Sequence, residues 1–318
     1  MDTSKSLALL TLSHLIDSLT SVSCGLETWY LSPGQEDWHP GQCLFQTKPA
    51  WIERELPGND GAFWAPALLT PRVMYYSVAS MGDEDAQCIG LARATGVAPH
   101  LTWSDSGEPI TCSFQPESNG EINMPNSIDP GTFRDEDGSA QLVFGGGRIW
   151  VTELDPVTGG QVEDNWWEEG DPTYHYLARG PPSQEDEGES EWIEAPYLTK
   201  HQGFYYLFVN WYGCCSGVDS TYEIHVGRSE AVSGPYRDQA GVLMTEGGGS
   251  LLLAREGRFI GPGHAGIFSE GGRQWLSYHF YDGEREGLPW VEVRRLDWDQ
   301  GWPTVTQERF NATAYFQQ

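Results

Sequence analysis

The chain has 318 residues, and its 46 acidic residues outnumber 18 basic ones, which gives a net charge of −28 at pH 7. A surface this acidic repels phosphate, so nucleic acid and anionic membranes are disfavoured as partners. The 38 Gly, 20 Pro and 14 Trp favour an all-β chain with many turns, and one β domain can fill this length. The aromatic residues either fill the core or line a cleft that stacks on carbohydrate.

The first 60 residues contain only part of a repeating unit. Residues 6–14 are predicted to form one strand, and residues 25–32 and 35–38 resemble the outer half of a sheet. Residues 1–24 are an atypical N-terminal segment and a poor secretory signal, because Ser, Thr and His interrupt the apolar run. No apolar run approaches the roughly 18 residues of a membrane-spanning helix.

Four longer units follow, and each opens with a short motif and continues into two apolar strands. The predicted strand pairs are 73–80 with 88–94, 140–146 with 148–155, 204–212 with 221–229, and 274–282 with 290–298. The opening prolines are Pro66, Pro130, Pro196 and Pro262, at separations of 64, 66 and 66 residues. Such a period accommodates a four-stranded sheet, so the repeat predicts the blades of a β-propeller. No linker divides the chain, and we expect one domain over residues 1–318.

The six cysteines show no spacing typical of a zinc site. Disulfides are possible, and the adjacent Cys214 and Cys215 can either close a small ring or remain two buried thiols. The other four are Cys24, Cys43, Cys88 and Cys112.

Two carboxyl groups lie in the opening motifs of successive units. Asp129 lies in SIDPGTF (127–133) and Glu194 in WIEAPYL (192–198), both in segments otherwise suited to burial. A carboxyl group in such a place needs a partner or a function. Glycoside hydrolysis requires a pair of carboxyl groups, one of which has a raised pKa and protonates the leaving oxygen. The alternative is that these acids only cap strands or bind each other's backbone.

Several longer motifs resemble those of glycoside hydrolase family 43, most closely its endo-α-1,5-L-arabinanase members. The resemblance runs from about residue 25 to residue 305 and includes FWAPALL (63–69), SIDPGTFRDEDG (127–138), WIEAPYL (192–198), YYLFVNWYGCCSGVDSTYEIHVGRS (205–229), SGPY (233–236), EGGGSLLL (246–253) and GPGHAGIF (261–268). The cysteine pair followed by DSTY, VGRS and GPY is the most specific part of the match.

The resemblance implies a five-bladed β-propeller, with the first blade incomplete at the N-terminus, and hydrolysis with inversion of configuration. It places Glu194 as the general acid and Asp129 as the acidic residue that orients the acid and keeps its pKa raised. It places His264 beside a central metal ion, usually calcium; the alternative is a hydrogen-bonded channel histidine. Trp64 and Tyr212 are the predicted substrate-binding aromatic residues, although Trp64 could equally belong to the core.

The sequence departs from the family pattern in several places. The catalytic base of the family is an Asp-Pro at the start of the first blade, which by register falls at or before Met1; Asp2 is the nearby acid, and Thr-Ser follows it. Ala67 stands where the family usually has Asp, and Ser216 where it usually has Arg. Residues 144–148, FGGGR, lack the aromatic residue of the corresponding family motif.

These observations support an enzyme that cleaves α-1,5-linked arabinofuranosyl bonds in arabinan. The alternatives are an arabinofuranosidase or β-xylosidase of the same family, and a non-catalytic propeller that binds carbohydrate and lacks the base. We expect a secreted monomer, since secretion follows from the family and the sequon Asn311-Ala312-Thr313 is compatible with it.

Overall fold

The computed structural model describes residues 26–30, 39–59, 63–80, 86–97, 100–113, 125–162, 172–181 and 192–310. The chain divides into two compact units, Met1–Gln115 with Asn311–Gln318, and Pro116–Phe310. The single domain over residues 1–318 stays a prediction. No helix in the described ranges has the length and apolar character needed to cross a membrane.

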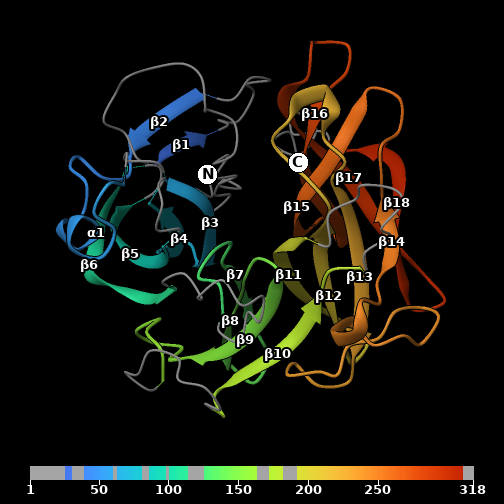
Figure 1. Cartoon of the computed structure of the whole chain (residues 1–318), viewed down its shortest axis with the longest axis horizontal. Helices are drawn as coiled ribbons and strands as arrows, with labels where there is room; N and C mark the ends of the chain where they lie inside the picture. Colours follow the sequence, from blue (N-terminus) through green and yellow to red (C-terminus); the bar gives the residue numbers. More distant parts are fainter. Residues whose placement is uncertain are drawn as a thin grey trace. The chain divides into compact units, whose positions relative to one another are not determined.

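The second unit contains three antiparallel four-stranded sheets that follow one another along the chain (Figure 1). The pairing follows chain order in all three, as expected for propeller blades. Two short 3-10 helices, η1 (Gly217–Asp219) and η2 (Met244–Glu246), lie in the loops of the middle sheet. The strands are β7 (Gly131–Arg134), β8 (Ala140–Phe144), β9 (Arg148–Leu154), β10 (Tyr174–Arg179), β11 (Ile193–His201), β12 (Phe204–Trp211), β13 (Glu223–Ser229), β14 (Ser250–Leu253), β15 (Phe259–Glu270), β16 (Arg273–Asp282), β17 (Leu288–Asp299) and β18 (Trp302–Arg309).

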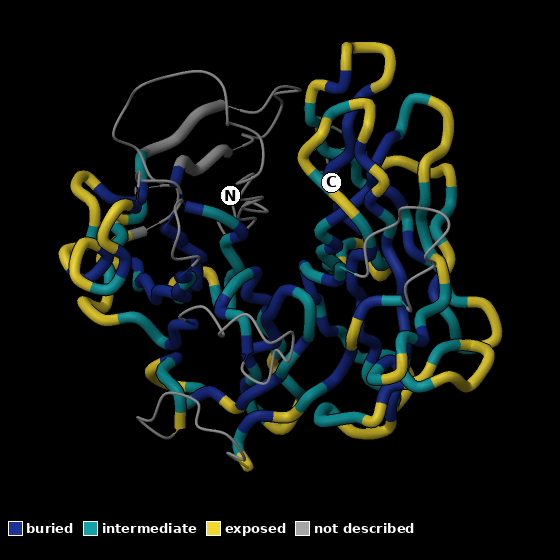
Figure 2. Tube along the Cα trace, in the orientation of Figure 1, coloured by how far each residue is buried: buried dark blue, intermediate teal, exposed yellow. Residues whose placement is uncertain are grey.

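The second strand of each sheet is the most deeply buried. In β12 and β16 nearly every side chain is buried, whereas exposed residues gather at the turns (Figure 2). Tyr206 and Phe208 of β12 belong to the same hydrophobic cluster as Leu276 and Phe280 of β16. Adjacent sheets therefore pack face to face, which explains why these strands are almost continuously apolar.

The first unit contains a fourth four-stranded sheet and a separate two-stranded sheet. The larger sheet pairs β3 (Phe63–Thr70), β4 (Val73–Ala79), β5 (Gln87–Val97) and β6 (His100–Ser113) in chain order. The smaller one pairs β1 (Glu27–Tyr30) with β2 (His39–Cys43). The short helix α1 (Ala50–Glu55), which the sequence did not predict, buries Trp51 and Ile52.

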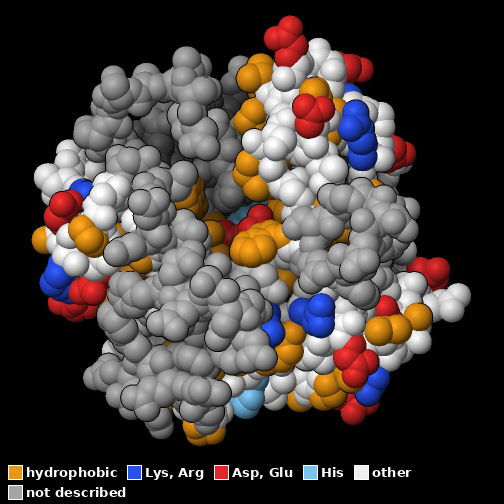
Figure 3. Space-filling model, in the orientation of Figure 1, with side chains coloured by type: hydrophobic (Ala, Val, Ile, Leu, Met, Phe, Trp, Pro, Cys, Tyr) orange, Lys and Arg blue, Asp and Glu red, His pale blue; other side chains and the backbone are white. Residues whose placement is uncertain are grey.

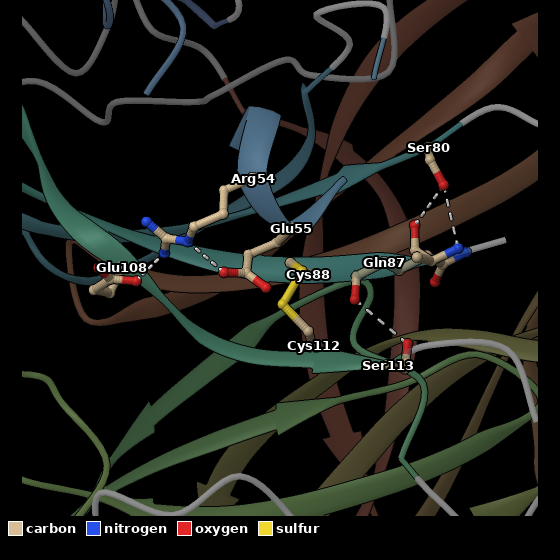
Figure 4. The surroundings of a disulfide bond; sticks show 9 residues. Arg54, Glu55, Ser80, Gln87, Cys88, Glu108, Cys112 and Ser113 are labelled. Carbon is tan, nitrogen blue, oxygen red and sulfur yellow. Dashed lines mark hydrogen bonds and ion pairs between the residues drawn. A yellow bond between two sulfur atoms is a disulfide. The ribbon is translucent and has the colours of Figure 1, made fainter. Parts of the chain in front are cut away.

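The possible disulfides are present in the described residues. Cys88 and Cys112 are cross-strand partners in β5 and β6 and are bonded to each other (Figure 4). Cys214 and Cys215 are also bonded, which decides between the ring and the two thiols, and Cys43 is disulfide-bonded too. Near the first bond, Arg54 of α1 contacts Glu108 of β6 and so ties the helix to the sheet (Figure 4).

The all-β propeller prediction is confirmed, and all eight predicted strands of the four repeats are present. The prediction of five blades is not met in the described residues, which form four four-stranded blades. The reason is that the described residues 26–30 and 39–59 supply two strands, which pair with each other, and a helix. The predicted segments at 6–14 and 35–38 lie outside the described ranges.

Gly131 allows two blades to approach closely. A Cβ atom there would overlap the main-chain oxygen of Pro196 in β11, and a methyl group of Val143 would lie 2.8 Å away. We therefore expect Gly131→Ala to lower the free energy of unfolding by roughly 1–3 kcal/mol in urea titrations. Gly160→Ala is the control, because the nearest atom to its Cβ would be Thr158 Oγ1 at 3.5 Å. Equal effects of the two substitutions would contradict this view of the blade contact.

Candidate active site

At the start of each blade a residue with a left-handed backbone occupies the equivalent position, within the first strand in three blades and two residues before β7 in the other. These residues are Ala65, Asp129, Ala195 and His264, with φ of 45°, 52°, 51° and 56°. In β3, β11 and β15 the ladder register shifts at this residue, as in a β-bulge. A non-glycine residue rarely adopts this conformation, so its recurrence marks a built feature of the fold.

The positions of the left-handed residues show that the fourth repeat was aligned wrongly from the sequence. The equivalent separations are 64, 66 and 69 residues, so the fourth motif is aligned on His264-Ala265 and not on Gly261-Pro262. Gly261 also has a left-handed backbone, with φ of 55°, and β15 contains a second register shift there. The Gly-Pro pair therefore resembled the opening motif because it forms an additional bulge.

In the middle blade Glu194 directly precedes the bulge of β11 and is partly buried. Trp192 Nε1 donates a hydrogen bond to Glu194 Oε2 at 2.6 Å, and the Tyr222 hydroxyl donates to Oε1 at 2.7 Å. Burial is the main cause that raises the pKa of Glu194 to about 7, and the nearby charge of Asp129 adds to it. The two hydrogen bonds act in the opposite direction. A carboxyl group in this state retains its proton close to neutral pH.

Asp129 lies two residues before β7 of the preceding blade and is only 4% exposed. Its Oδ2 accepts a hydrogen bond from the main-chain N–H of Ala195 at 3.1 Å. Burial raises the pKa of Asp129, and the hydrogen bond from Ala195 only partly offsets it. Asp129 thus binds the backbone of the next blade, as the structural interpretation expects, and its charge also acts on the pKa of Glu194. Its role in catalysis stays a prediction.

Asn210 of β12, the cross-strand partner of Glu194, makes the corresponding contact with the last blade. Its Oδ1 accepts from the N–H of His264 at 2.9 Å, and its Nδ2 donates to the main-chain oxygens of Glu223 and Pro262 at 2.9 and 3.1 Å. Sequence reasoning missed Asn210, Trp192 and Tyr222. Trp192 and Tyr222 lie inside the WIEAPYL and DSTY motifs, which was the available signal.

Comparison with known proteins decides the family of the chain. Residues 28–303 match the family described as glycosyl hydrolases family 43. The chain belongs to this family. It is 31% identical to the extracellular exo-α-(1→5)-L-arabinofuranosidase of Cellvibrio japonicus (strain Ueda107), covering 90% of this chain and 85% of that one. It is 33% identical to the extracellular endo-α-(1→5)-L-arabinanase 1 of Bacillus subtilis (strain 168), covering 86% and 78%.

Solved structures of family 43 proteins agree with the fold. An exo-1,5-α-L-arabinanase from a bovine ruminal metagenomic library superposes with a TM-score of 0.75 at 28% identity, over 90% of this chain and 91% of that one. The native arabinanase of Bacillus subtilis superposes with a TM-score of 0.71 at 32% identity, over 90% of each chain. The likeness therefore extends over nearly the whole chain.

The predicted metal residue of this family 43 chain, His264, is partly buried in β15. Burial lowers the pKa of His264 to about 4, so the imidazole is neutral near pH 7 and has a lone pair for a metal ion. However, no three His, Cys, Asp or Glu side chains gather around a metal-sized space in the described part of the chain. Calcium prefers several oxygen ligands, so these side chains alone do not form its site, and no step below depends on it.

The two predicted substrate-binding residues lie in different units. Trp64 is in β3 of the first unit and is partly buried. Tyr212 follows β12, and its main-chain N–H donates to the oxygen of Trp192 at 3.2 Å. Tyr212 therefore lies next to Trp192, whose indole donates a hydrogen bond to Glu194. The roles of both aromatic residues in substrate binding stay predictions.

The effect of the Asp129 charge on the pKa of Glu194 should be measurable in a pH–rate profile. Asp129→Asn removes a nearby negative charge that raises the pKa of Glu194, while an amide oxygen can still accept from Ala195. We expect the alkaline limb of the pH–rate profile to move to lower pH. The same limb in Asp137→Asn, a substitution of an exposed acid in the same blade, should not move. A profile of Asp129→Asn that coincides with the parent would contradict this role.

The raised pKa of Glu194 should also affect stability. Its carboxyl group is protonated in both states below the usual value of 4.5, but above this pH the unfolded chain releases the proton first. The folded state therefore becomes less stable relative to the unfolded chain as the pH rises from 4.5 to about 7. Glu194→Gln should reduce the difference in unfolding free energy between about pH 4 and pH 8 by roughly 1–3 kcal/mol, after discounting for partial exposure. An unchanged difference in urea titrations would contradict the raised pKa.

Proposed function

We propose that the chain hydrolyses α-1,5-linked L-arabinofuranosyl bonds in arabinan with inversion of configuration. The observation that carries this proposal is the partly buried carboxyl group of Glu194, which holds its proton near neutral pH. The names of the two curated relatives, an exo-acting arabinofuranosidase and an endo-acting arabinanase, support the substrate.

In the proposed reaction, Glu194 donates its proton to the glycosidic oxygen as the bond to the anomeric carbon breaks. Water attacks the opposite face of the sugar, and a carboxylate base accepts its proton. The resemblance to family 43 assigns this base to an Asp ahead of residues 6–14, and Asp2 lies outside the described residues. Asp129 orients the site through Ala195 and favours the protonated form of Glu194.

Three further features belong to the same proposal. The two-stranded sheet of β1 and β2 is the outer half of a fifth blade. If a calcium ion binds, His264 would be one of its ligands and the ion would lend positive charge to the site. The protein is a secreted monomer, and the extracellular names of the two relatives support the secretion.

The main alternative is a propeller that binds arabinan without cleaving it. It predicts that the purified chain binds arabino-oligosaccharides and releases no product. Within the enzyme class, internal and terminal cleavage are separated by product size, since an endo-acting enzyme forms intermediate oligosaccharides early and an exo-acting enzyme releases one short product. The anomeric configuration of the first product, followed by NMR, tests inversion, and a retained configuration would refute the proposed mechanism.

The role of Glu194 is tested by Glu194→Gln, which keeps the shape of the side chain but cannot donate an acidic proton. We expect kcat on linear arabinan to fall by about 10²- to 10⁴-fold. The binding affinity for arabino-oligosaccharides, measured by isothermal titration calorimetry, should change little. Glu292→Gln is the matched control, because Glu292 contacts Arg309 at 3.0 Å in β17 and β18. Turnover by Glu194→Gln equal to that of the control would exclude Glu194 as the acid.

A further inference from the structure

We propose that Trp192 and Tyr222 are positioning residues that hold the acidic proton of Glu194 on the oxygen facing Tyr222. The inference rests on the proposed function, because it concerns which oxygen delivers the proton. It follows from the different hydrogen-bonding capacities of an indole and a phenol.

The hydrogen bond from Trp192 determines which oxygen of the protonated Glu194 carboxyl group is the carbonyl oxygen. An indole N–H can donate a hydrogen bond but cannot accept one. In a protonated carboxyl group the carbonyl oxygen is the better acceptor, and Trp192 Nε1 lies 2.6 Å from Glu194 Oε2. Oε2 is therefore the carbonyl oxygen of the acid form, and the proton lies on Oε1.

Tyr222 fits both protonation states of Glu194. A phenol hydroxyl can donate or accept, and the hydroxyl of Tyr222 lies 2.7 Å from Oε1. It can accept from the acid form and, after rotating, donate to the carboxylate. When the O–H bond of Glu194 breaks, the proton joins the glycosidic oxygen, which also takes the electron pair of the broken C–O bond. Tyr222 keeps its own proton throughout, because burial raises the pKa of its hydroxyl well above the usual value.

The rings of Trp192 and Tyr222 each pack against a glycine that leaves room for them. A Cβ atom on Gly146 would lie 2.9 Å from Trp192 Cζ2, and a Cβ atom on Gly263 would overlap the ring of Tyr222. Neither glycine has a positive φ, so the backbone at both positions would accept another residue. The space for the two rings is what requires glycine.

Other hydrogen bonds fix the backbone beneath Trp192. Its main-chain oxygen accepts from Tyr212 N at 3.2 Å, and the adjacent oxygen of Ile193 accepts from Gly147 N at 2.7 Å. On the other side, the ring of Tyr222 stacks on His279 with the centroids 5.9 Å apart. The titratable groups that act on Glu194 and Tyr222 are Asp129 and Tyr281.

The first test is infrared spectroscopy of the full chain without substrate, at a pH where Glu194 is protonated. With ¹³C-labelled glutamate, the carboxyl C=O stretch of Glu194 is the band that Glu194→Gln removes. We expect Trp192→Phe to raise this frequency, because the carbonyl oxygen loses its donor, and Tyr222→Phe to shift it much less. Gly146→Ala should shift it in the same direction as Trp192→Phe, since it displaces the indole without removing it.

Two control variants remove equivalent groups elsewhere and should leave the band unchanged. Trp298→Phe removes a donor to Gln274 Oε1 at 2.5 Å, and Tyr236→Phe removes a hydroxyl that donates to Val232 O at 3.0 Å. A shift in Tyr222→Phe that exceeds the shift in Trp192→Phe would place the proton on the other oxygen and overturn the proposal. The absence of a protonated Glu194 band in the parent protein would overturn it as well.

The second test uses aryl arabinofuranosides whose leaving groups differ in basicity. Tyr222→Phe should lower kcat by about 10- to 100-fold for a basic leaving group that needs the proton, and far less for a strongly acidic phenol that leaves without it. An equal loss for both leaving groups would show a merely structural role. Failure of the parent protein to hydrolyse any arabinoside would refute the proposed function instead, while the infrared result on the free protein would stand.

Discussion

The burial of two carboxyl groups, on successive blades of one unit, is the constraint on which the site depends. Water stabilises a carboxylate strongly, so each group that leaves water must keep its proton or find compensating donors. Asp129 accepts a hydrogen bond from a main-chain N–H and Glu194 accepts two from side chains, and burial still raises the pKa of both carboxyl groups. This raised pKa is what the proposed general acid requires.

The repeated bulge explains how the fold supplies these positions. A left-handed residue lies at the start of each blade, and in β3, β11 and β15 it interrupts the strand and frees a main-chain N–H that the regular ladder does not use. The N–H of Ala195 donates to Asp129 and the N–H of His264 donates to Asn210, so these two bulges are held by polar side chains from the preceding blades. The strain at the bulges is thus offset by hydrogen bonds between blades, and the same bonds align the acid.

Much of this arrangement could be predicted from the sequence, and the exceptions have physical causes. Periodicity revealed the four blades, and the opening motifs indicated Glu194 and Asp129 as candidate site residues. The fourth motif was misaligned because Gly261-Pro262 forms a bulge of its own three residues before His264. Asn210 and Tyr222 were missed because their partners are 54 and 28 residues away, and only the folded sheets bring them together.

Neutron diffraction from deuterium-exchanged crystals at near-neutral pH tests the central claim most directly, because it locates the proton of a carboxyl group. The account predicts a deuteron on the Glu194 oxygen that faces Tyr222, with the deuterated indole nitrogen of Trp192 directed at the other oxygen. An ionised Glu194 with no deuteron on either oxygen would contradict it, because burial would then not control the charge of the acid.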